Sequence, residues 1–263
     1  MKGRKTKERS DGMKKRMMFV AGLALVLAGC QTQDEGRNSS ASSASINTEA
    51  STSNSASTNS STNEETAAIG EDLPLNDTQY GRGAASDGAD TNEEEEATRI
   101  LTADSKSIII YFSRSGNTEN LARMIHNENQ ADVLELAVEN PYPADYEEAV
   151  ERANEERENQ DYPEISTEIP DFGQYDRIYL GYQTWSMTLS HPITSFLMDH
   201  GEEFNGKTIY PFSTNAGYGE GDTLERIGEL APGATIAESF EIQDEDLLAN
   251  QDQVIAWVAD SES

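Results

Sequence analysis

Residues 108–118 read IIIYFSRSGNT, and this stretch decides the fold. Its first five residues are all β-branched or aromatic, which predicts a strand buried on both faces of a parallel sheet. Beyond the loop, Leu121, Met124 and Ile125 recur at the i, i+3, i+4 spacing of a helix. The loop at residues 113–118 therefore joins a central strand to the start of a helix.

This loop has the composition of an anion-binding site. Ser113, Ser115 and Thr118 supply hydroxyl groups, and Gly116 lets a ligand approach the backbone closely. The first N–H groups of a helix have no partner within the helix, and the helix dipole is positive at this end. A phosphate group is the leading candidate for the bound anion.

Strand and helix signals alternate along the chain on both sides of this loop. The predicted strands are residues 107–112, 133–136, 177–181, 208–212 and 235–240. The predicted helices start near Thr118, Tyr146, Pro192, Asp222 and Leu247. The second of these has an apolar face at Tyr146, Ala149, Val150 and Ala153, opposite a face rich in glutamate. Five successive strand–helix units predict an α/β domain with a parallel sheet and helices on both faces.

The N-terminus has the features of a lipoprotein signal peptide. Basic residues 14–16 precede an apolar run at residues 17–29, which is shorter than the roughly 20 residues that a membrane-spanning helix needs. The run ends in Leu27-Ala28-Gly29-Cys30, which resembles the lipobox of bacterial lipoproteins. We expect cleavage before Cys30 and attachment of lipid to this cysteine, which is the only one in the chain.

Composition divides the chain into three parts. We interpret residues 1–29 as the signal peptide and residues 30–100 as the lipidated cysteine followed by a disordered spacer rich in Ser, Thr, Asn and acidic residues. Residues 101–263 form the predicted folded domain, which holds 8 basic and 33 acidic residues. This acidic balance excludes nucleic acid as a partner, because a phosphate backbone requires a basic surface.

Two further loops leave the same edge of the predicted sheet. Ligands of open α/β sheets bind beyond the carboxyl ends of the strands, where residues 182–191 carry Trp185 and residues 213–221 carry Tyr218. One aromatic side chain from each loop could enclose a flat ring system.

Other chemistries lack their motifs. No lysine follows a G-x-x-x-x-G pattern, the glycines at residues 217–221 lack the dinucleotide spacing, and no G-x-S-x-G elbow is present. His126, His191 and His200 show no metal-ligand spacing. We therefore assign no catalytic acid, base or metal ligand.

The residues quoted above resemble a known family. The loop at residues 113–118 is similar to the phosphate loop of flavodoxins, and residues 140–146, NPYPADY, are similar to a stretch typical of a flavodoxin-like branch often found in bacterial lipoproteins. The likeness extends through residues 180–185 and 211–217, although relatives typically have Pro, Trp and Gly where this chain has Gln183, Ser186 and Met187.

The resemblance implies a flavodoxin-like, doubly wound, five-stranded parallel sheet of order 2-1-3-4-5 that binds FMN non-covalently. The implied cofactor-binding residues are Ser113, Arg114, Ser115, Gly116, Asn117, Thr118, Thr184, Trp185, Ser186, Met187, Thr214, Asn215, Ala216, Gly217 and Tyr218.

Together these features predict a lipid-anchored protein that faces away from the cytoplasm and transfers electrons through FMN. It would act as a carrier or as a small FMN-dependent oxidoreductase that reduces a quinone-like acceptor. The alternative is a non-redox lipoprotein that keeps the fold and binds another ligand or a partner.

Overall fold

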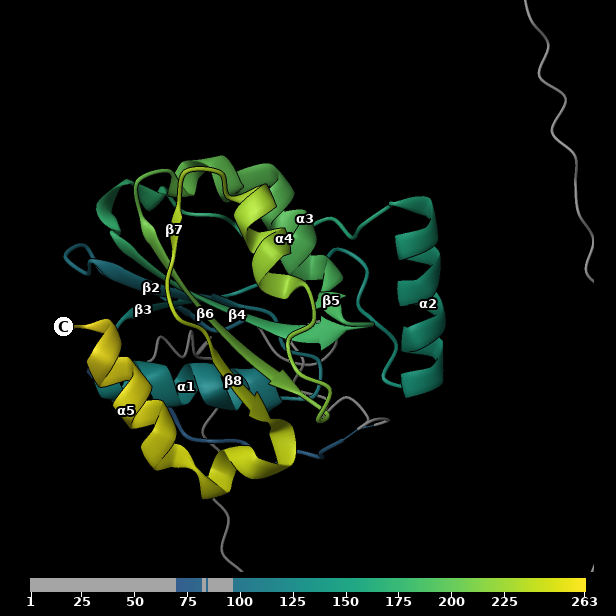
Figure 1. The fold of residues 1–263 in the computed structure, drawn as a ribbon, viewed down its shortest axis with the longest axis horizontal. Coiled ribbons are helices and arrows are strands. Elements are labelled where there is room, and N and C mark those ends of the chain that lie inside the picture. The colour runs from purple at the N-terminus through teal and green to yellow at the C-terminus, as the bar shows by residue number, and fades with distance from the viewer. Residues whose placement is uncertain (1–69, 82–83, 85–96) are drawn as a thin grey trace, which may run out of the picture. The chain divides into compact units, whose positions relative to one another are not determined.

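The computed structural model describes residues 70–81, 84 and 97–263 (Figure 1). The predicted signal peptide, Cys30 and most of the predicted spacer lie outside the described residues.

An eight-stranded sheet forms the centre of the domain (Figure 1). Its main path runs β1-β3-β2-β4-β6-β7, with β5 paired to β4 and β8 paired to β6. The strands are β1 (Arg99–Ile100), β2 (Ser107–Tyr111), β3 (Asp132–Glu135), β4 (Arg177–Trp185), β5 (Thr188–Leu189), β6 (Thr208–Asn215), β7 (Thr235–Ile236) and β8 (Phe240–Gln243).

The predicted strand order is confirmed. Strands β3, β2, β4 and β6, followed by β7 and β8, are parallel neighbours and reproduce the order 2-1-3-4-5. Two antiparallel additions were not predicted, namely β1 against β3 and β5 against β4. The fifth predicted strand is divided, because β7 pairs with the start of β6 and β8 with its end.

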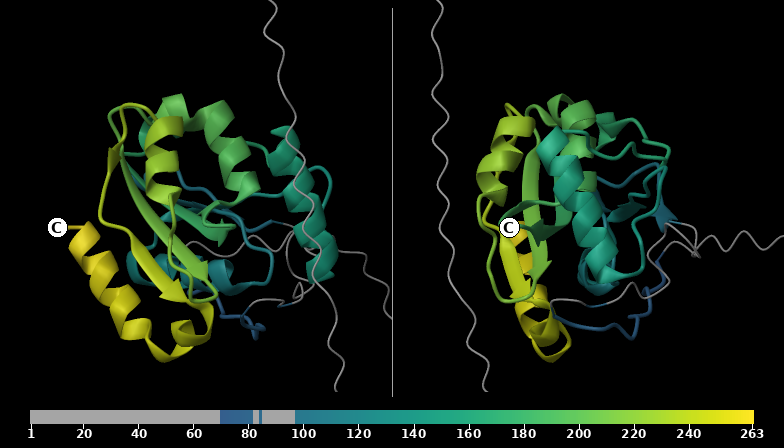
Figure 2. Two further views of the ribbon diagram at one scale, coloured as in Figure 1. Left: turned by 45° about the vertical axis from the view of Figure 1, so that its right-hand side comes forward. Right: turned by 90° about the vertical axis from the view of Figure 1, so that its right-hand side faces the viewer.

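Helices cover both faces of the sheet (Figures 1 and 2). Helices α1 and α5 cover one face, and α3 and α4 cover the other. The helices are α1 (Asn117–Asn129), α2 (Tyr146–Asn159), α3 (His191–His200), α4 (Thr223–Leu230) and α5 (Gln251–Ser261), with short 3-10 helices η1 (Phe172–Gln174), η2 (Gly201–Phe204) and η3 (Asp244–Ala249). No helix in the described part of the chain is long and apolar enough to cross a membrane.

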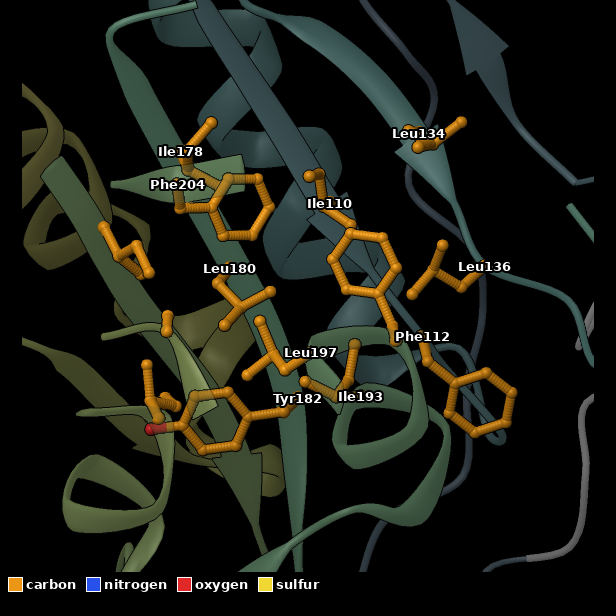
Figure 3. Packing of buried hydrophobic residues seen from close by; sticks show 14 of the residues in the cluster. Ile110, Phe112, Leu134, Leu136, Ile178, Leu180, Tyr182, Ile193, Leu197 and Phe204 are labelled. Carbon is orange, nitrogen blue, oxygen red and sulfur yellow. The ribbon is translucent and has the colours of Figure 1, made fainter. Parts of the chain in front are cut away.

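The apolar run of β2 is buried on both faces, as its sequence predicted. Ile110 and Phe112 belong to the cluster that packs beneath α3, where Figure 3 shows them near Ile193 and Leu197. Ile109 belongs to the second cluster, which lies beneath α1 and α5. The strict alternation of side chains along a strand explains why one short run contributes to both cores.

Helix α2 lies apart from the other helices, beside the sheet (Figure 1). Ala149 is its only buried residue, and Val150 is 38% exposed. An apolar helix face normally packs against the core. The face of α2 at Tyr146, Ala149, Val150 and Ala153 instead lines a cavity.

Ordered packing begins before residue 101, the predicted start of the folded domain. Residues 70–81 already pack along α1, where the backbone N–H of Asn76 donates to Asn120 Oδ1 at 2.7 Å. Strand β1 also precedes residue 101, and the backbone N–H of Thr98 donates to Glu135 Oε2 at 2.9 Å. The polar composition of residues 70–81 concealed this packing, because hydrogen bonds to α1 hold much of the segment in place.

Candidate cofactor site

A cavity of about 380 Å³ lies at the carboxyl edge of the sheet, within the about 300–1,000 Å³ typical of small-molecule sites. The loops that follow β2, β4 and β6 all contribute to its lining, as the sequence predicted. The predicted cofactor residues in the lining are Arg114, Ser115, Asn117, Thr184, Trp185, Ser186, Met187, Thr214, Asn215, Ala216 and Tyr218. Ser113, Gly116, Thr118 and Gly217 belong to the same loops but are not part of the lining.

Gly116 turns the chain from the first loop into α1. It is the N-cap residue with φ of 79°, a left-handed conformation that glycine adopts without steric penalty. Its carbonyl accepts a hydrogen bond from the backbone N–H of Asn120 at 2.8 Å, so α1 starts directly after it. The start of a long helix therefore lies beside the cavity, together with Ser115 and Asn117.

Thr118 joins the three loops. Its hydroxyl lies 2.8 Å from that of Thr214, and Gln183 Nε2 donates to it at 2.8 Å. Gln183 also donates to the carbonyl of Phe112. Since Thr118 is 1% exposed, the structure places its hydroxyl in a buried junction rather than at the cavity surface. Gln183 lines the cavity and was not predicted as a site residue. The sequence feature that could have indicated its role is a polar amide near the end of a largely apolar strand.

The middle loop is a tight hairpin between β4 and β5. Ser186 and Met187 have φ of 53° and 67°, values that suit the two central residues of a type I′ turn but that side-chain-bearing residues rarely adopt. The backbone N–H of Asp222 donates to the Met187 carbonyl at 3.0 Å. A Cβ on Gly221 would lie 2.0 Å from that same carbonyl oxygen, so only glycine fits there. The third loop thus holds the turn in place.

Trp185 stands next to this turn, half-buried in an aromatic cluster. Its ring centroid lies 5.1 Å from that of Tyr142 and 5.6 Å from that of His191, in both cases edge to face. Among the described residues, none of the aromatic contacts of Trp185 is a parallel stack. Its geometry therefore leaves parallel stacking available to a ligand ring.

The third loop is organised by Asn215. Asn215 Oδ1 accepts the backbone N–H groups of Gly217, Tyr218 and Gly219 at 2.8, 3.0 and 3.3 Å. Its Nδ2 donates to Glu241 Oε1 at 2.7 Å. Tyr218 is 59% exposed at the cavity rim.

The partly buried carboxylate of Glu156 fixes α2 beside the cavity. Glu156 accepts hydrogen bonds from Tyr142 Oη at 2.6 Å, Arg152 Nε at 2.7 Å and His191 Nδ1 at 2.8 Å. Burial alone would raise the pKa of Glu156, but these hydrogen bonds outweigh it and hold the pKa below its ordinary value. We call these four residues the Glu156 clasp; through it α2 is joined to the start of α3.

The clasp orients a wall of the cavity that sequence analysis missed. Six residues of α2 line the cavity, namely Tyr146, Ala149, Val150, Ala153, Asn154 and Arg157. From the opposite side, the guanidinium of Arg114 lies 5.8 Å from the ring centroid of Tyr146 and donates to the carbonyl of Ala84.

Comparison with known proteins identifies the family. A family model described as Flavodoxin matches residues 106–261, which is more than half of the chain. This chain belongs to the flavodoxin family. No curated protein matches the sequence.

Solved structures are similar to this chain, and one of them, with a TM-score above 0.5, agrees with the flavodoxin assignment at the level of the fold. A protein from Bacteroides uniformis ATCC 8492, classed as a flavoprotein, is 22% identical with a TM-score of 0.51, over 59% of this chain and 98% of that one. A flavoprotein in complex with FMN from Lactobacillus acidophilus NCFM is 26% identical with a TM-score of 0.47, over 56% of this chain and 99% of that one. Two-electron reduced Megasphaera elsdenii flavodoxin is 21% identical with a TM-score of 0.37, over 59% of this chain and 98% of that one.

The cavity of this flavodoxin has groups that fit FMN. Gln183 Oε1 and Thr184 Oγ1 are buried atoms without a hydrogen-bond partner among the described residues, and both side chains belong to the lining. Buried polar atoms normally have partners, which a polar ligand would supply. Arg114 and Arg157 provide positive charge for a phosphate. Within the described chain, no three or more His, Cys, Asp or Glu side chains are arranged to hold a metal ion.

Proposed function

We propose that this flavodoxin binds FMN in the cavity at the carboxyl edge and transfers electrons, either as a carrier or as a small reductase of a quinone-like acceptor. The observation that carries the proposal is the convergence of the phosphate-type loop, Trp185 and Tyr218 on one cavity. Bound FMN would supply one- and two-electron chemistry, and the protein would control its position and access.

Each part of the cavity suits one part of FMN. The start of α1 and the Ser115 hydroxyl favour the phosphate, because helix N-termini and hydroxyl groups stabilise anions. Trp185 and Tyr218 offer aromatic surface for the ring system. We assign the roles of binding and orienting FMN to the side chains that line the cavity.

Flavin binding is tested by adding FMN to the purified protein and recording absorbance after desalting. We expect retained flavin absorbance and quenched flavin fluorescence. Trp185→Ala should weaken binding and restore fluorescence, since stacking contributes about 0.5–1.5 kcal/mol beyond area burial. Phe240→Leu, a change in the core away from the lining, is the control. A wild-type protein that never retains FMN would exclude the proposal and favour a non-redox binding role.

We also propose that a lipid on Cys30 anchors the protein to the membrane, with the domain facing away from the cytoplasm. The support is the sequence at residues 14–30, where a basic and apolar signal ends at the cysteine. Labelling cells with a fatty acid should mark the wild-type protein and leave Cys30→Ala unmarked. Label on the Cys30→Ala protein would place the anchor elsewhere.

A further inference from the structure

Helix α1 has a polar stripe that faces the segment at residues 70–81. Asn117, Asn120, Arg123 and Asn127 lie on one side of the helix, and Asn120 is fully buried. Buried amides need hydrogen-bond partners, and on this side they find them in a segment that precedes the flavodoxin match at residue 106.

Two of these asparagines bind the backbone of the segment in the manner of a neighbouring strand. Asn127 accepts from the N–H of Leu73 at 2.7 Å and donates to its carbonyl at 3.0 Å. Asn120 makes the same pair with Asn76 at 2.7 and 2.9 Å. Each side-chain amide thus satisfies both backbone groups of one residue, so the segment runs antiparallel to α1 toward the cavity.

At the start of α1 the segment reaches the phosphate-type loop. Thr78 Oγ1 donates to Asn117 Oδ1 at 2.6 Å, and Asn117 Nδ2 donates to the carbonyl of Gln79 at 2.8 Å. The N–H of Gly81 donates to Asp244 Oδ2 at 2.7 Å. Gly81 and Asp244 both line the cavity, so the segment forms part of its wall.

These contacts determine how the Ser115 hydroxyl is used. Because Asn117 Oδ1 accepts from Thr78, its Nδ2 faces Ser115 Oγ and donates to it at 3.3 Å. A hydroxyl that accepts through its oxygen keeps its own hydrogen available for donation. Ser115 lines the cavity, so this hydrogen is available to a phosphate oxygen.

We infer that the segment at residues 76–81 is a working part of the FMN site, and that Thr78 is a positioning residue that aligns Asn117 and Ser115 toward the phosphate. The inference rests on the proposed binding of FMN. It assigns part of the phosphate site to residues that lie outside the family domain.

The first test compares FMN with riboflavin, which lacks the phosphate, in the full chain. Thr78→Val should weaken FMN binding about tenfold and change riboflavin binding less than about twofold, because only the phosphate contact is lost. Thr78→Ser keeps the hydroxyl and should restore FMN binding. Thr102→Val is the matched control, since Thr102 donates to Asp132 Oδ1 at 2.8 Å, outside the cavity lining.

The outcomes separate the two proposals. If the wild-type chain binds neither flavin, the proposed function fails and this inference fails with it. If it binds FMN but Thr78→Val binds both flavins as tightly as wild type, or loses both equally, only the inference fails.

A second test needs no substitution. Hydrogen exchange of the wild-type chain should slow on FMN addition at residues 76–81 as well as in the loop at residues 113–118, because ordering the loop also orders its support. Riboflavin should protect the segment less than FMN does. Protection of the loop alone would show that the segment is not part of the site.

Discussion

Ser186 and Met187 hold the middle loop in a left-handed conformation that neither residue favours. Bonds from the third loop maintain it, through Asp222 and the close approach of Gly221 to the Met187 carbonyl. Strain of this kind at a ligand-binding loop keeps the turn in one shape, with Trp185 directly before it. A substitution that relieves this strain should therefore raise the free energy of unfolding.

Met187→Gly should raise the free energy of unfolding by about 1 kcal/mol, since a left-handed residue with a side chain costs about 1–2 kcal/mol and part of the gain is lost to the flexibility of glycine. Urea denaturation measures the change. The contrast is Met198→Gly, because Met198 is 57% exposed in α3 and glycine in a helix should lower stability by about 1 kcal/mol. Destabilisation at both positions would show that the turn is unstrained.

At the scale of elements, α2 is held by polar contacts rather than by the core. Only Ala149 is buried, and the Glu156 clasp supplies the contact to α3. Arg152 also donates to the carbonyls of Asn140 and Pro141, but the contact to α3 depends on the ionised carboxylate of Glu156. This dependence makes the wall sensitive to acid.

Glu156→Gln should lower the free energy of unfolding at pH 7 by roughly 1.5–3 kcal/mol, the magnitude of hydrogen bonds to a charged group. The folded-state pKa of Glu156 is lowered, so its contribution is present above the unfolded pKa near 4.5 and is lost as pH falls through the folded value. The two proteins should converge in stability at low pH. Glu155→Gln, at an exposed neighbouring position, is the control. An equal loss of stability in this variant would show that the hydrogen bonds of Glu156 do not stabilise the fold.

The pKa of Glu135, a buried residue of β3, is shifted in the direction opposite to that of Glu156. Burial, together with the charge of Glu119, raises the pKa of Glu135 to about 8. A carboxyl group with a raised pKa stabilises the fold below its unfolded pKa, near 4.5, and this contribution is lost as pH rises toward 8.

Glu135→Gln should remove this loss and raise stability at pH 8 by more than about 1 kcal/mol relative to wild type. Denaturation curves between pH 5 and 9 test it, with the exposed Glu139→Gln as the control. A wild-type stability that stays flat over this range would show that Glu135 is ionised throughout.

At the scale of the whole molecule, the excess of acid places the cavity in a negative field. Residues 101–263 hold 33 acidic and 8 basic residues. Screening limits the field to charges within about 10 Å at 0.1 M salt, so carboxylates near the cavity such as Asp244 matter most. Arg114 and Arg157 oppose them at short range.

The potential for the second one-electron reduction of bound FMN should lie below that of free FMN, because full reduction can add a negative charge to the ring and the field disfavours it. The difference should shrink as ionic strength rises. A redox titration at low and high salt measures both effects. Glu220→Gln, in the third loop, should raise the potential more than Glu128→Gln at the far end of α1. A potential at or above that of free FMN, insensitive to salt, would show that local hydrogen bonds dominate.

The sequence by itself determined the order of the elements and the loops that form the cavity, because a buried β-run and a helix stripe are recognisable from neighbouring residues alone. The strand order followed only from the resemblance to flavodoxins. Only the tertiary structure decided that residues 70–81 pack along α1, that the apolar face of α2 lines the cavity, and that the Thr118 hydroxyl turns to Thr214. Each of these depends on a polar partner distant in the chain, and no local pattern specifies which distant partner satisfies a buried hydroxyl or amide.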